Sequence, residues 1–149
     1  MDDAPIQIEE ATAATDALVG AVARLVGELS ASARPPSAEE VGRIVASPAS
    51  RLLVARAGEE IVGMLTLVVF PIPTGTRAWI EDVVVAAAVR GRGIGASLTN
   101  AAIALAGELG ARTVDLTSRP SREAANRMYL RLGFTQRETN VYRYEGSTT

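Results

Sequence analysis

The segment 90–96 combines exposed backbone amides with arginine. It reads Arg90-Gly91-Arg92-Gly93-Ile94-Gly95-Ala96, and apolar residues continue from it at helical spacing. Glycines leave their N–H groups unshielded, and a helix N-terminus adds unpartnered amides and the positive end of the helix dipole. The segment is therefore predicted to bind an anion. Phosphate is the expected anion, because arginine makes paired hydrogen bonds to it.

A second group of candidates precedes this segment. Residues 79–85 read Trp-Ile-Glu-Asp-Val-Val-Val, which is typical of a strand, and Val83–Val85 predict that it is buried on both faces. Glu81 and Asp82 are the candidate general bases. Regular alternation would turn their side chains to opposite faces, so that only one would face a ligand.

Three residue types are missing from the chain, and their absence excludes several kinds of site. There is no cysteine and no histidine, so disulfides, a Ser-His-Asp triad and metal sites built on thiolate or imidazole are excluded. All 15 cationic residues are arginine. A P-loop needs lysine after its glycines, so that interpretation fails as well. We expect no metal.

A dinucleotide site is the other phosphate-binding alternative. Residues 91–96 satisfy the glycine pattern, and Asp115 lies where a ribose-binding acid would be. However, only about 30 residues follow Asp115, too few for the further β-α units of that fold. The position of the motif in the chain argues against it.

Length and composition predict one domain over residues 1–149, with 146–149 as a frayed tail. No apolar run approaches the roughly 20 residues of a membrane span, and no export signal is visible, so we expect a cytoplasmic protein without membrane contact. The net charge of −2 and 4% aromatic residues give no support for nucleic-acid binding.

The remaining pattern predicts a mixed α/β domain in the order β-α-α-β-β-β-α-β-α-β. Ser37 and Glu40 have the spacing of a capping box at the start of the second helix. Loops are expected at 30–37 and 71–76. The predicted strands are 6–8, 51–56, 61–70, 79–85, 113–117 and 135–144, and the predicted helices are 18–29, 37–46, 94–109 and 122–132.

Two separated motifs resemble one protein family. The first is Arg-x-x-Gly-x-Gly at 90–95, preceded by the strand that carries Glu81. The second is 125–134, an alanine followed by an aliphatic-Tyr pair at Met128-Tyr129 and then Gly133-Phe134. Their order and spacing closely resemble the GNAT superfamily of N-acetyltransferases, and the resemblance covers nearly the whole chain. It implies a GNAT-like acyl-CoA N-acyltransferase fold.

The resemblance also implies acetyl-CoA as cosubstrate. Its pyrophosphate would lie on the glycine segment, and its pantetheine arm would pair with the preceding strand like an extra strand. Asn126 would contact the pantetheine amides. The cofactor-binding residues implied in this way are Val83, Val84, Val85, Arg90, Gly91, Arg92, Gly93, Ile94, Gly95, Ala96 and Asn126.

The implied reaction is direct attack of an amine on the acetyl thioester. Tyr129 matches the position of the acid that protonates the departing thiolate, although a packed helix residue is the alternative. We select Glu81 as the base because bases of the family often lie on this strand. Asp82, or no dedicated base, is the alternative. A backbone amide near Val84 would stabilise the oxyanion.

The sequence therefore predicts an acetyl-CoA-dependent N-acetyltransferase acting on a primary amine in a ternary complex. The alternative is an acyl-CoA-binding sensor or regulatory module without catalysis. The acceptor, a small amine or a peptide, and the acyl-chain preference stay open. A homodimer through the last strand is compatible with the resemblance.

Overall fold

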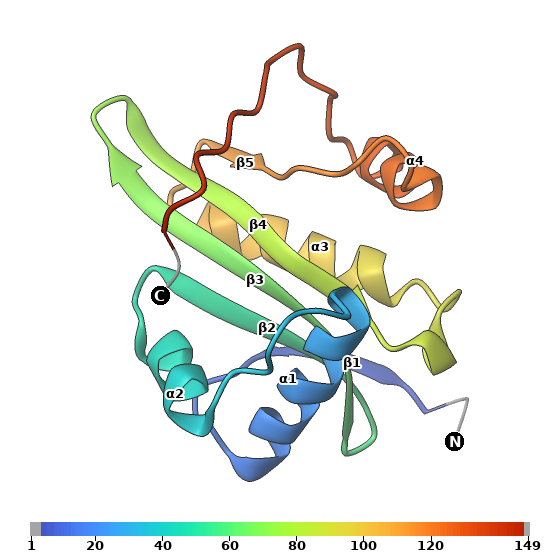
Figure 1. Cartoon of the computed structure of the whole chain (residues 1–149). Coiled ribbons are helices and arrows are strands. Elements are labelled where there is room, and N and C mark those ends of the chain that lie inside the picture. The colour runs from blue at the N-terminus through green and yellow to red at the C-terminus, as the bar shows by residue number, and fades with distance from the viewer. Residues whose placement is uncertain (1–3, 148–149) are drawn as a thin grey trace. The chain divides into compact units, whose positions relative to one another are not determined.

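The computed structural model describes residues 4–147 (Figure 1). The chain divides into two compact units, one ending at Thr117 and the other beginning at Ser118, and each is described by itself. The elements of the first unit are β1 (Ile6–Glu10), α1 (Asp16–Leu29), α2 (Ala38–Ala46), β2 (Ser50–Ala57), β3 (Glu60–Ile72), β4 (Gly75–Val85), the 3-10 helix η1 (Ala87–Val89), α3 (Ile94–Glu108) and β5 (Thr113–Asp115). The second unit contains α4 (Glu123–Arg131).

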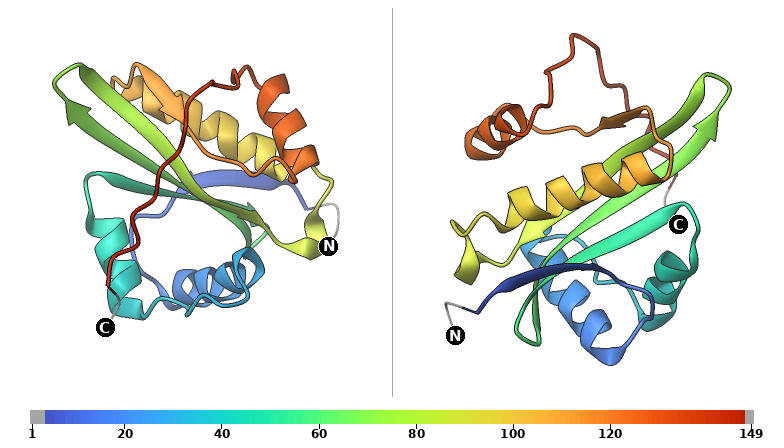
Figure 2. Two further views of the ribbon diagram at one scale, coloured as in Figure 1. Left: turned by 45° about the horizontal axis from the view of Figure 1, so that its top comes forward. Right: turned by 180° about the vertical axis from the view of Figure 1, so that it is seen from behind.

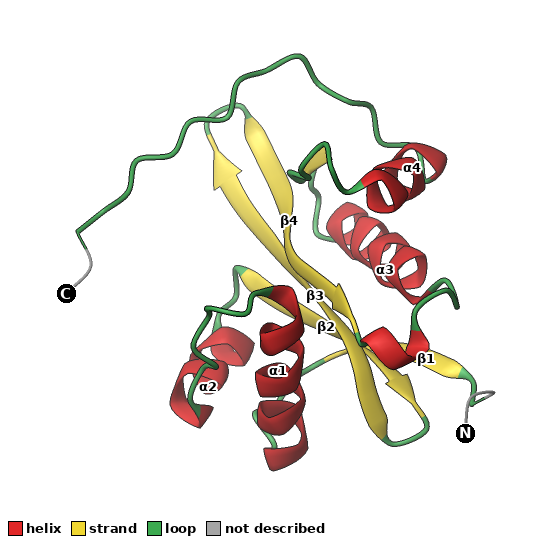
Figure 3. Ribbon diagram, turned by 45° about the vertical axis from the view of Figure 1, so that its right-hand side comes forward, coloured by secondary structure: helices red, strands yellow, loops and turns green. Residues whose placement is uncertain are grey.

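The first unit is built on one mixed sheet in the order β1-β2-β3-β4-β5. The first four strands pair antiparallel, and β5 pairs parallel with β4. Helices α1 and α2 cover one face of the sheet, and α3 covers the other (Figures 2 and 3). The sheet is thus covered on both faces, as the long apolar runs of β2 and β3 require.

The core follows from the apolar stripes of the helices. On one face of the sheet a buried cluster joins α1 and α2 to the strands. On the other face, Ile94 and Leu98 of α3 are fully buried and approach β3 closely at Gly63. The buried members of the first cluster are Leu18, Ala21, Val22, Leu25, Val41, Leu52, Val54, Ile61, Met64 and Val84.

Strand β4 has an irregularity that the sequence did not predict. Thr66 pairs with Glu81 and Met64 pairs with Val84, so that two residues of β4 lie opposite the single residue Leu65 of β3. One of the two is Asp82, whose φ of 51° is in the left-handed region. This is a β-bulge, which bends a strand and changes the direction of the side chains beyond it.

Several predicted elements are confirmed, and two are wrong. The helices and the hairpin around residue 58 form as predicted, and β5 ends at Asp115, earlier than predicted. The predicted loop 71–76 is a tight hairpin instead, in which only Pro73 and Thr74 lie outside β3 and β4. The predicted strand 135–144 is wrong, because the segment contains neither strand nor helix. Of the predicted tail, residues 148–149 lie outside the described part.

None of the helices in residues 4–147 is long and apolar enough to cross a membrane.

Candidate active site

The glycine segment forms the turn that leads from η1 into α3. Gly91 and Gly93 have φ values of 86° and 75°, a conformation that favours glycine. Gly93 is the N-cap of α3, and no side chain caps this end of the helix. The glycines are therefore needed for the turn itself, and they also leave its surface as bare backbone.

The amides from Gly91 to Ala96 precede the first hydrogen bond of α3. The first bond of the helix is donated by the Ser97 amide to the Gly93 carbonyl, at 3.0 Å. Within residues 4–147, the amides from Gly91 to Ala96 donate to no protein acceptor. A row of free N–H groups at a helix N-terminus is a binding site for an anion such as phosphate.

The two arginines of the segment have different surroundings. Arg90 Nε donates to the Val85 carbonyl at 3.4 Å, and its Nη2 lies 3.8 Å from the Glu28 carboxylate. Arg92 Nη2 donates to the Ala4 carbonyl at 2.8 Å. Both side chains are exposed, so each guanidinium keeps donors that are available to a ligand.

The end of β4 next to this turn has a free edge. Strand β5 pairs with β4 only at residues 77–79, and the last pair joins Trp79 to Asp115. Beyond this pair, Ile80–Val85 have no strand partner on that side within the described residues. The bulge lies in this unpaired stretch, so β4 separates from β5 where it approaches the glycine turn.

Strand alternation decides which backbone groups face the free edge. The Ala86 amide donates to the Val62 carbonyl at 2.8 Å, so this residue faces β3, and Val84 two residues earlier does the same. The Val85 carbonyl instead accepts from Arg90. The backbone groups of Val85, and by the same alternation those of Val83, therefore face the free edge.

Glu81 lies on the bulged stretch. Its carboxylate accepts a hydrogen bond of 2.6 Å from the indole N–H of Trp79, two residues earlier on the same strand. The prediction that Glu81 and Asp82 point to opposite faces assumed a regular strand. That assumption is wrong, because the bulge interrupts the alternation at Asp82, and both side chains are exposed.

In the second unit, Tyr129 lies in the middle of the second motif. It is buried, and its ring meets that of Phe134 edge-on, with the centroids 5.7 Å apart. Burial raises the pKa of the Tyr129 hydroxyl above its ordinary value, and the Arg122 charge opposes that shift. The hydroxyl is therefore protonated at neutral pH, as a proton donor must be.

Gly133 and Phe134, the last two residues of the second motif, form the C-terminal end of α4. Gly133 has a φ of 103°, and its amide donates to the Leu130 carbonyl, while the Phe134 amide donates to the Tyr129 carbonyl at 3.0 Å. These bonds form a Schellman motif, which ends α4 and brings Phe134 back onto Tyr129. Sequence reasoning found the motif but missed this contact.

Asn126 is also in the second unit. Its side-chain nitrogen donates to the Arg119 carbonyl at 3.0 Å. The Arg122 amide donates to the same carbonyl, also at 3.0 Å. Asn126 therefore holds the turn before α4, and its side-chain oxygen is the atom left for a ligand.

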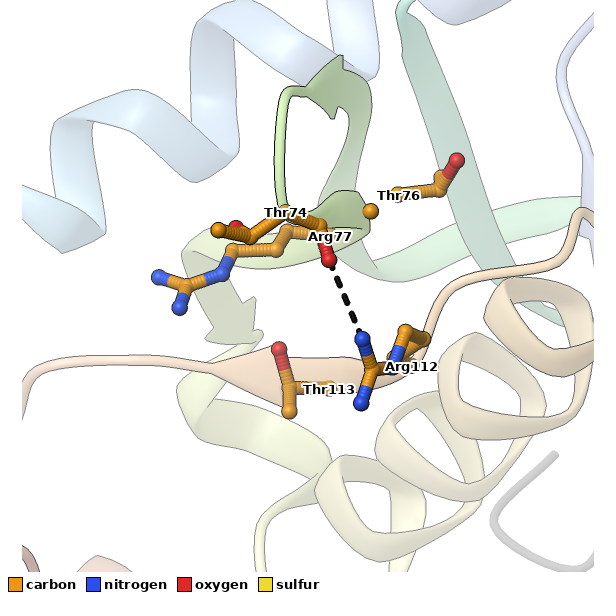
Figure 4. A pocket seen from close by; sticks show the side chains of 6 residues that line it. Thr74, Thr76, Arg77, Arg112 and Thr113 are labelled. Atoms are coloured by element: carbon orange, nitrogen blue, oxygen red, sulfur yellow. Dashed lines mark hydrogen bonds between the residues drawn. The ribbon is translucent and has the colours of Figure 1, made fainter.

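A small pocket lies at the opposite end of β4 from the glycine turn (Figure 4). Arg112 crosses it, donating from its Nη1 to the Thr74 carbonyl at 3.0 Å and from its amide to the Thr76 carbonyl at 2.9 Å. These bonds fasten β5 to the hairpin. None of the predicted site residues lines this pocket, which is formed by Thr74, Gly75, Thr76, Arg77, Arg112 and Thr113.

A comparison with models of protein families identifies the family of this chain. The model of the acetyltransferase (GNAT) family matches residues 22–134, which include both motifs. The chain belongs to the GNAT acetyltransferase family. The resemblance predicted from the two motifs is confirmed, and so is the GNAT fold with its mixed sheet and four helices. Among curated protein sequences, none matches this chain.

Solved structures agree with a GNAT fold. A transcriptional regulator from Bacillus halodurans C-125 is 32% identical, covers 95% of this chain and 100% of its own, and has a TM-score of 0.76. A putative acetyltransferase from Agrobacterium tumefaciens str. C58 is 25% identical over 93% of this chain and 99% of its own, with a TM-score of 0.82.

An aminoglycoside acetyltransferase from an uncultured soil metagenomic sample, solved with trehalose, has a TM-score of 0.85. It is 23% identical over 99% of this GNAT chain and 100% of its own. At that identity the similarity shows the fold alone.

Within residues 4–147, no group of three or more acidic side chains is placed to hold a metal ion.

Proposed function

We propose that this GNAT protein is an N-acetyltransferase that moves the acetyl group of acetyl-CoA to a primary amine by direct attack in a ternary complex. The observation that carries the proposal is the row of free amides from Gly91 to Ala96, next to the free edge of β4. A diphosphate and an extended amide arm are the two chemical features of CoA that such a surface would bind.

The cofactor roles divide between the turn and the strand. The pyrophosphate accepts from the amides of residues 91–96, with the side chains of Arg90 and Arg92 adding charge. The pantetheine arm pairs along Val83–Val85 through main-chain bonds, for which Val83 and Val85 face the free edge. Asn126 contributes its side-chain oxygen to the pantetheine amides.

The acetyl transfer needs a neutral amine, a stabilised oxyanion and a protonated leaving group. Glu81 takes the proton that the ammonium group must lose, directly or through water. The amine nitrogen then bonds to the thioester carbon, and a backbone amide next to Val84 on the free edge, that of Val83 or Val85, stabilises the oxyanion. The C–S bond breaks as the oxyanion collapses, and the CoA sulfur takes a proton from the Tyr129 hydroxyl. The attacking nitrogen gives up its second proton, which restores that hydroxyl through water, so that the products are the neutral amide and the CoA thiol.

We also propose that the two compact units act as one domain over residues 1–149. The support is the family model, whose match from 22 to 134 runs across the boundary between Thr117 and Ser118. Each unit alone carries only one of the two motifs.

The Tyr129→Phe variant tests the proposed reaction. Loss of the acid is expected to lower kcat about 100-fold or more, since a general acid contributes 10²–10⁴. The Kd of CoA, measured by calorimetry, should stay within about twofold of wild type, because the ring is retained. Tyr144→Phe, which removes the hydroxyl of an exposed tyrosine, is the matched control. An unchanged kcat in Tyr129→Phe would remove the acid role.

A second candidate is a module that binds acyl-CoA without catalysis. The observation that favours it is the 32% identity to a structure described as a transcriptional regulator. A panel of primary amines, peptides and an aminoglycoside, assayed for thiol release from acetyl-CoA, separates the two. Saturable CoA binding with no thiol release above the acceptor-free rate would favour the sensor.

A further inference from the structure

Glu28, in the last turn of α1, reaches the connection between β4 and α3. Its Oε1 accepts a hydrogen bond of 2.8 Å from the Ala87 amide, 59 residues further along the chain. Ala87 is the first residue of η1, the short turn that leads from β4 toward the glycine segment. Figure 1 shows the end of α1 near the end of β4. A helix on one face of the sheet thus holds the start of the phosphate-binding turn.

The same carboxylate oxygen also lies 3.8 Å from Arg90 Nη2, at the other end of that turn. Arg90 is tied back to the strand, because its Nε donates to the Val85 carbonyl. Glu28 therefore contacts both ends of the segment 87–90. Among the described residues, no other carboxylate from a different element bonds to this segment.

The two contacts differ in strength and in their effect on an anion. The Arg90 pair is long, and the Arg90 side chain is 62% exposed, so the pair contributes little to stability. The bond to the Ala87 amide is short and charge-assisted, and so holds the turn more firmly. The negative charge beside Arg90 opposes phosphate binding, whereas the bond to Ala87 favours it by fixing the turn.

We propose that Glu28 is a positioning residue for the cofactor, which acts by fixing the 87–90 turn so that the amides of 91–96 are held ready for phosphate. The inference rests on the proposed function in assigning phosphate to those amides. Glu28 lies outside both family motifs, on helix α1, whose apolar side chains pack in the core.

Two substitutions separate the hydrogen bond from the charge. Glu28→Gln keeps an oxygen that can accept from Ala87 but removes the charge, and Glu28→Ala removes both. Calorimetry with CoA alone should give a Kd about three- to tenfold higher for Glu28→Ala, the value of one lost hydrogen bond. Glu28→Gln should bind CoA as tightly as wild type or more tightly. Glu39→Ala, which removes an exposed carboxylate paired with Arg43 on α2, is the control.

Hydrogen exchange without ligand tests the positioning separately from the cofactor. The Ala87 amide should lose protection in Glu28→Ala and keep it in Glu28→Gln. Wild-type affinity in Glu28→Ala, equal weakening in both variants, or unchanged Ala87 exchange in Glu28→Ala would each overturn the inference. If wild type bound no CoA while the exchange pattern held, the proposed function would fail and the positioning of the turn would stand.

Discussion

Helices α2 and α3 begin in opposite ways. The N-terminus of α2 is closed by its own side chains: Ser37 Oγ accepts from the Glu40 amide at 3.1 Å, and Glu40 accepts from the Ser37 amide at 2.8 Å. The N-terminus of α3 has glycine in the place of Ser37 and Ala96 in the place of Glu40. One helix supplies its own carboxylate, and the other has no side-chain cap among the described residues.

The helices also differ in how they are held to the rest of the unit. In α2 only Val41 is buried, so its capping box contributes to the stability of a short helix that has little core contact. In α3, Ile94 and Leu98 anchor the first turns in the core. Helix α3 therefore does not need a side-chain cap, because the packing of its first turns fixes the residue at which the helix begins.

The most direct test of this difference is to place a carboxylate at the start of α3, at the position that Glu40 has in α2. Ala96→Glu places a negative charge at the third helical position, where Glu40 lies in α2. Because the charge would repel phosphate at the same amides, the Kd of CoA should rise at least about tenfold. The folded state should be stabilised or unchanged, since acidic groups at a helix N-terminus contribute about 0.3–1 kcal/mol.

Calorimetry with CoA and thermal unfolding measure the two effects of Ala96→Glu. Ala96→Gln is the control of equal size without charge, and it should bind CoA more tightly than the glutamate variant. Wild-type affinity in Ala96→Glu would mean that phosphate does not lie at this helix end.

Disturbing the packing of α3 is expected to have a smaller effect on binding and a clear one on stability. A Cβ on Gly63 would lie 3.3 Å from Ile94 Cγ2, from Leu98 Cδ1 and from the Val84 carbonyl oxygen. The backbone oxygen cannot give way without moving β4, so Gly63→Ala should cost about 1–3 kcal/mol of unfolding free energy.

Denaturant unfolding measures this cost. Gly42→Ala in α2 is the matched control, because nothing lies within 4 Å of the added carbon. Alanine should stabilise that helix, by up to about 1 kcal/mol. We expect the Kd of CoA to rise with Gly63→Ala and to stay unchanged with Gly42→Ala. Equal stability of the two variants would show that α3 is not held by this close approach.

The sequence was a good guide to α2 and α3 because their starting signals are local. Ser37 and Glu40 are three residues apart, and the glycines of α3 directly precede its apolar stripe. The bulge at Asp82 was not predictable from its own residues. Glu-Asp-Val-Val-Val fits a regular strand, and the extra residue appears only in the register with β3.

Other features depend on residues far apart in the chain. The hydrogen bond from the Ala87 amide to Glu28 joins residues 59 apart, and no sequence pattern predicts that they meet. The segment 135–144 contains Val141, Tyr142 and Tyr144, which suit a strand, but a strand needs a partner, and none of the described strands pairs with it. For Tyr129 the motif indicated a position, while its burial and its contact with Phe134 came from the structure.

The smallest effects are expected at the start of α2. Ser37→Ala removes the side-chain cap and should lower the unfolding free energy by about 1 kcal/mol. The Kd of CoA should not change, since this helix end binds no ligand in the proposed function. A clear loss of CoA affinity in Ser37→Ala would mean that the two N-termini are not independent.

The pH dependence of the same cap sharpens the comparison. The hydrogen bond from the Ser37 backbone, followed by that with its hydroxyl, lowers the pKa of the Glu40 carboxyl from its ordinary value of 4.5. A group whose pKa is lower in the folded state contributes stability above its unfolded pKa and loses it as the pH falls through the folded value. The stability difference between wild type and Glu40→Gln should therefore be constant at neutral pH and shrink below pH 4.5.

The stability that Ala96→Glu adds should show the same pH dependence if its carboxylate caps α3 as Glu40 caps α2. If the stability difference between Ala96→Glu and wild type does not change with pH, the added carboxylate makes no such contact.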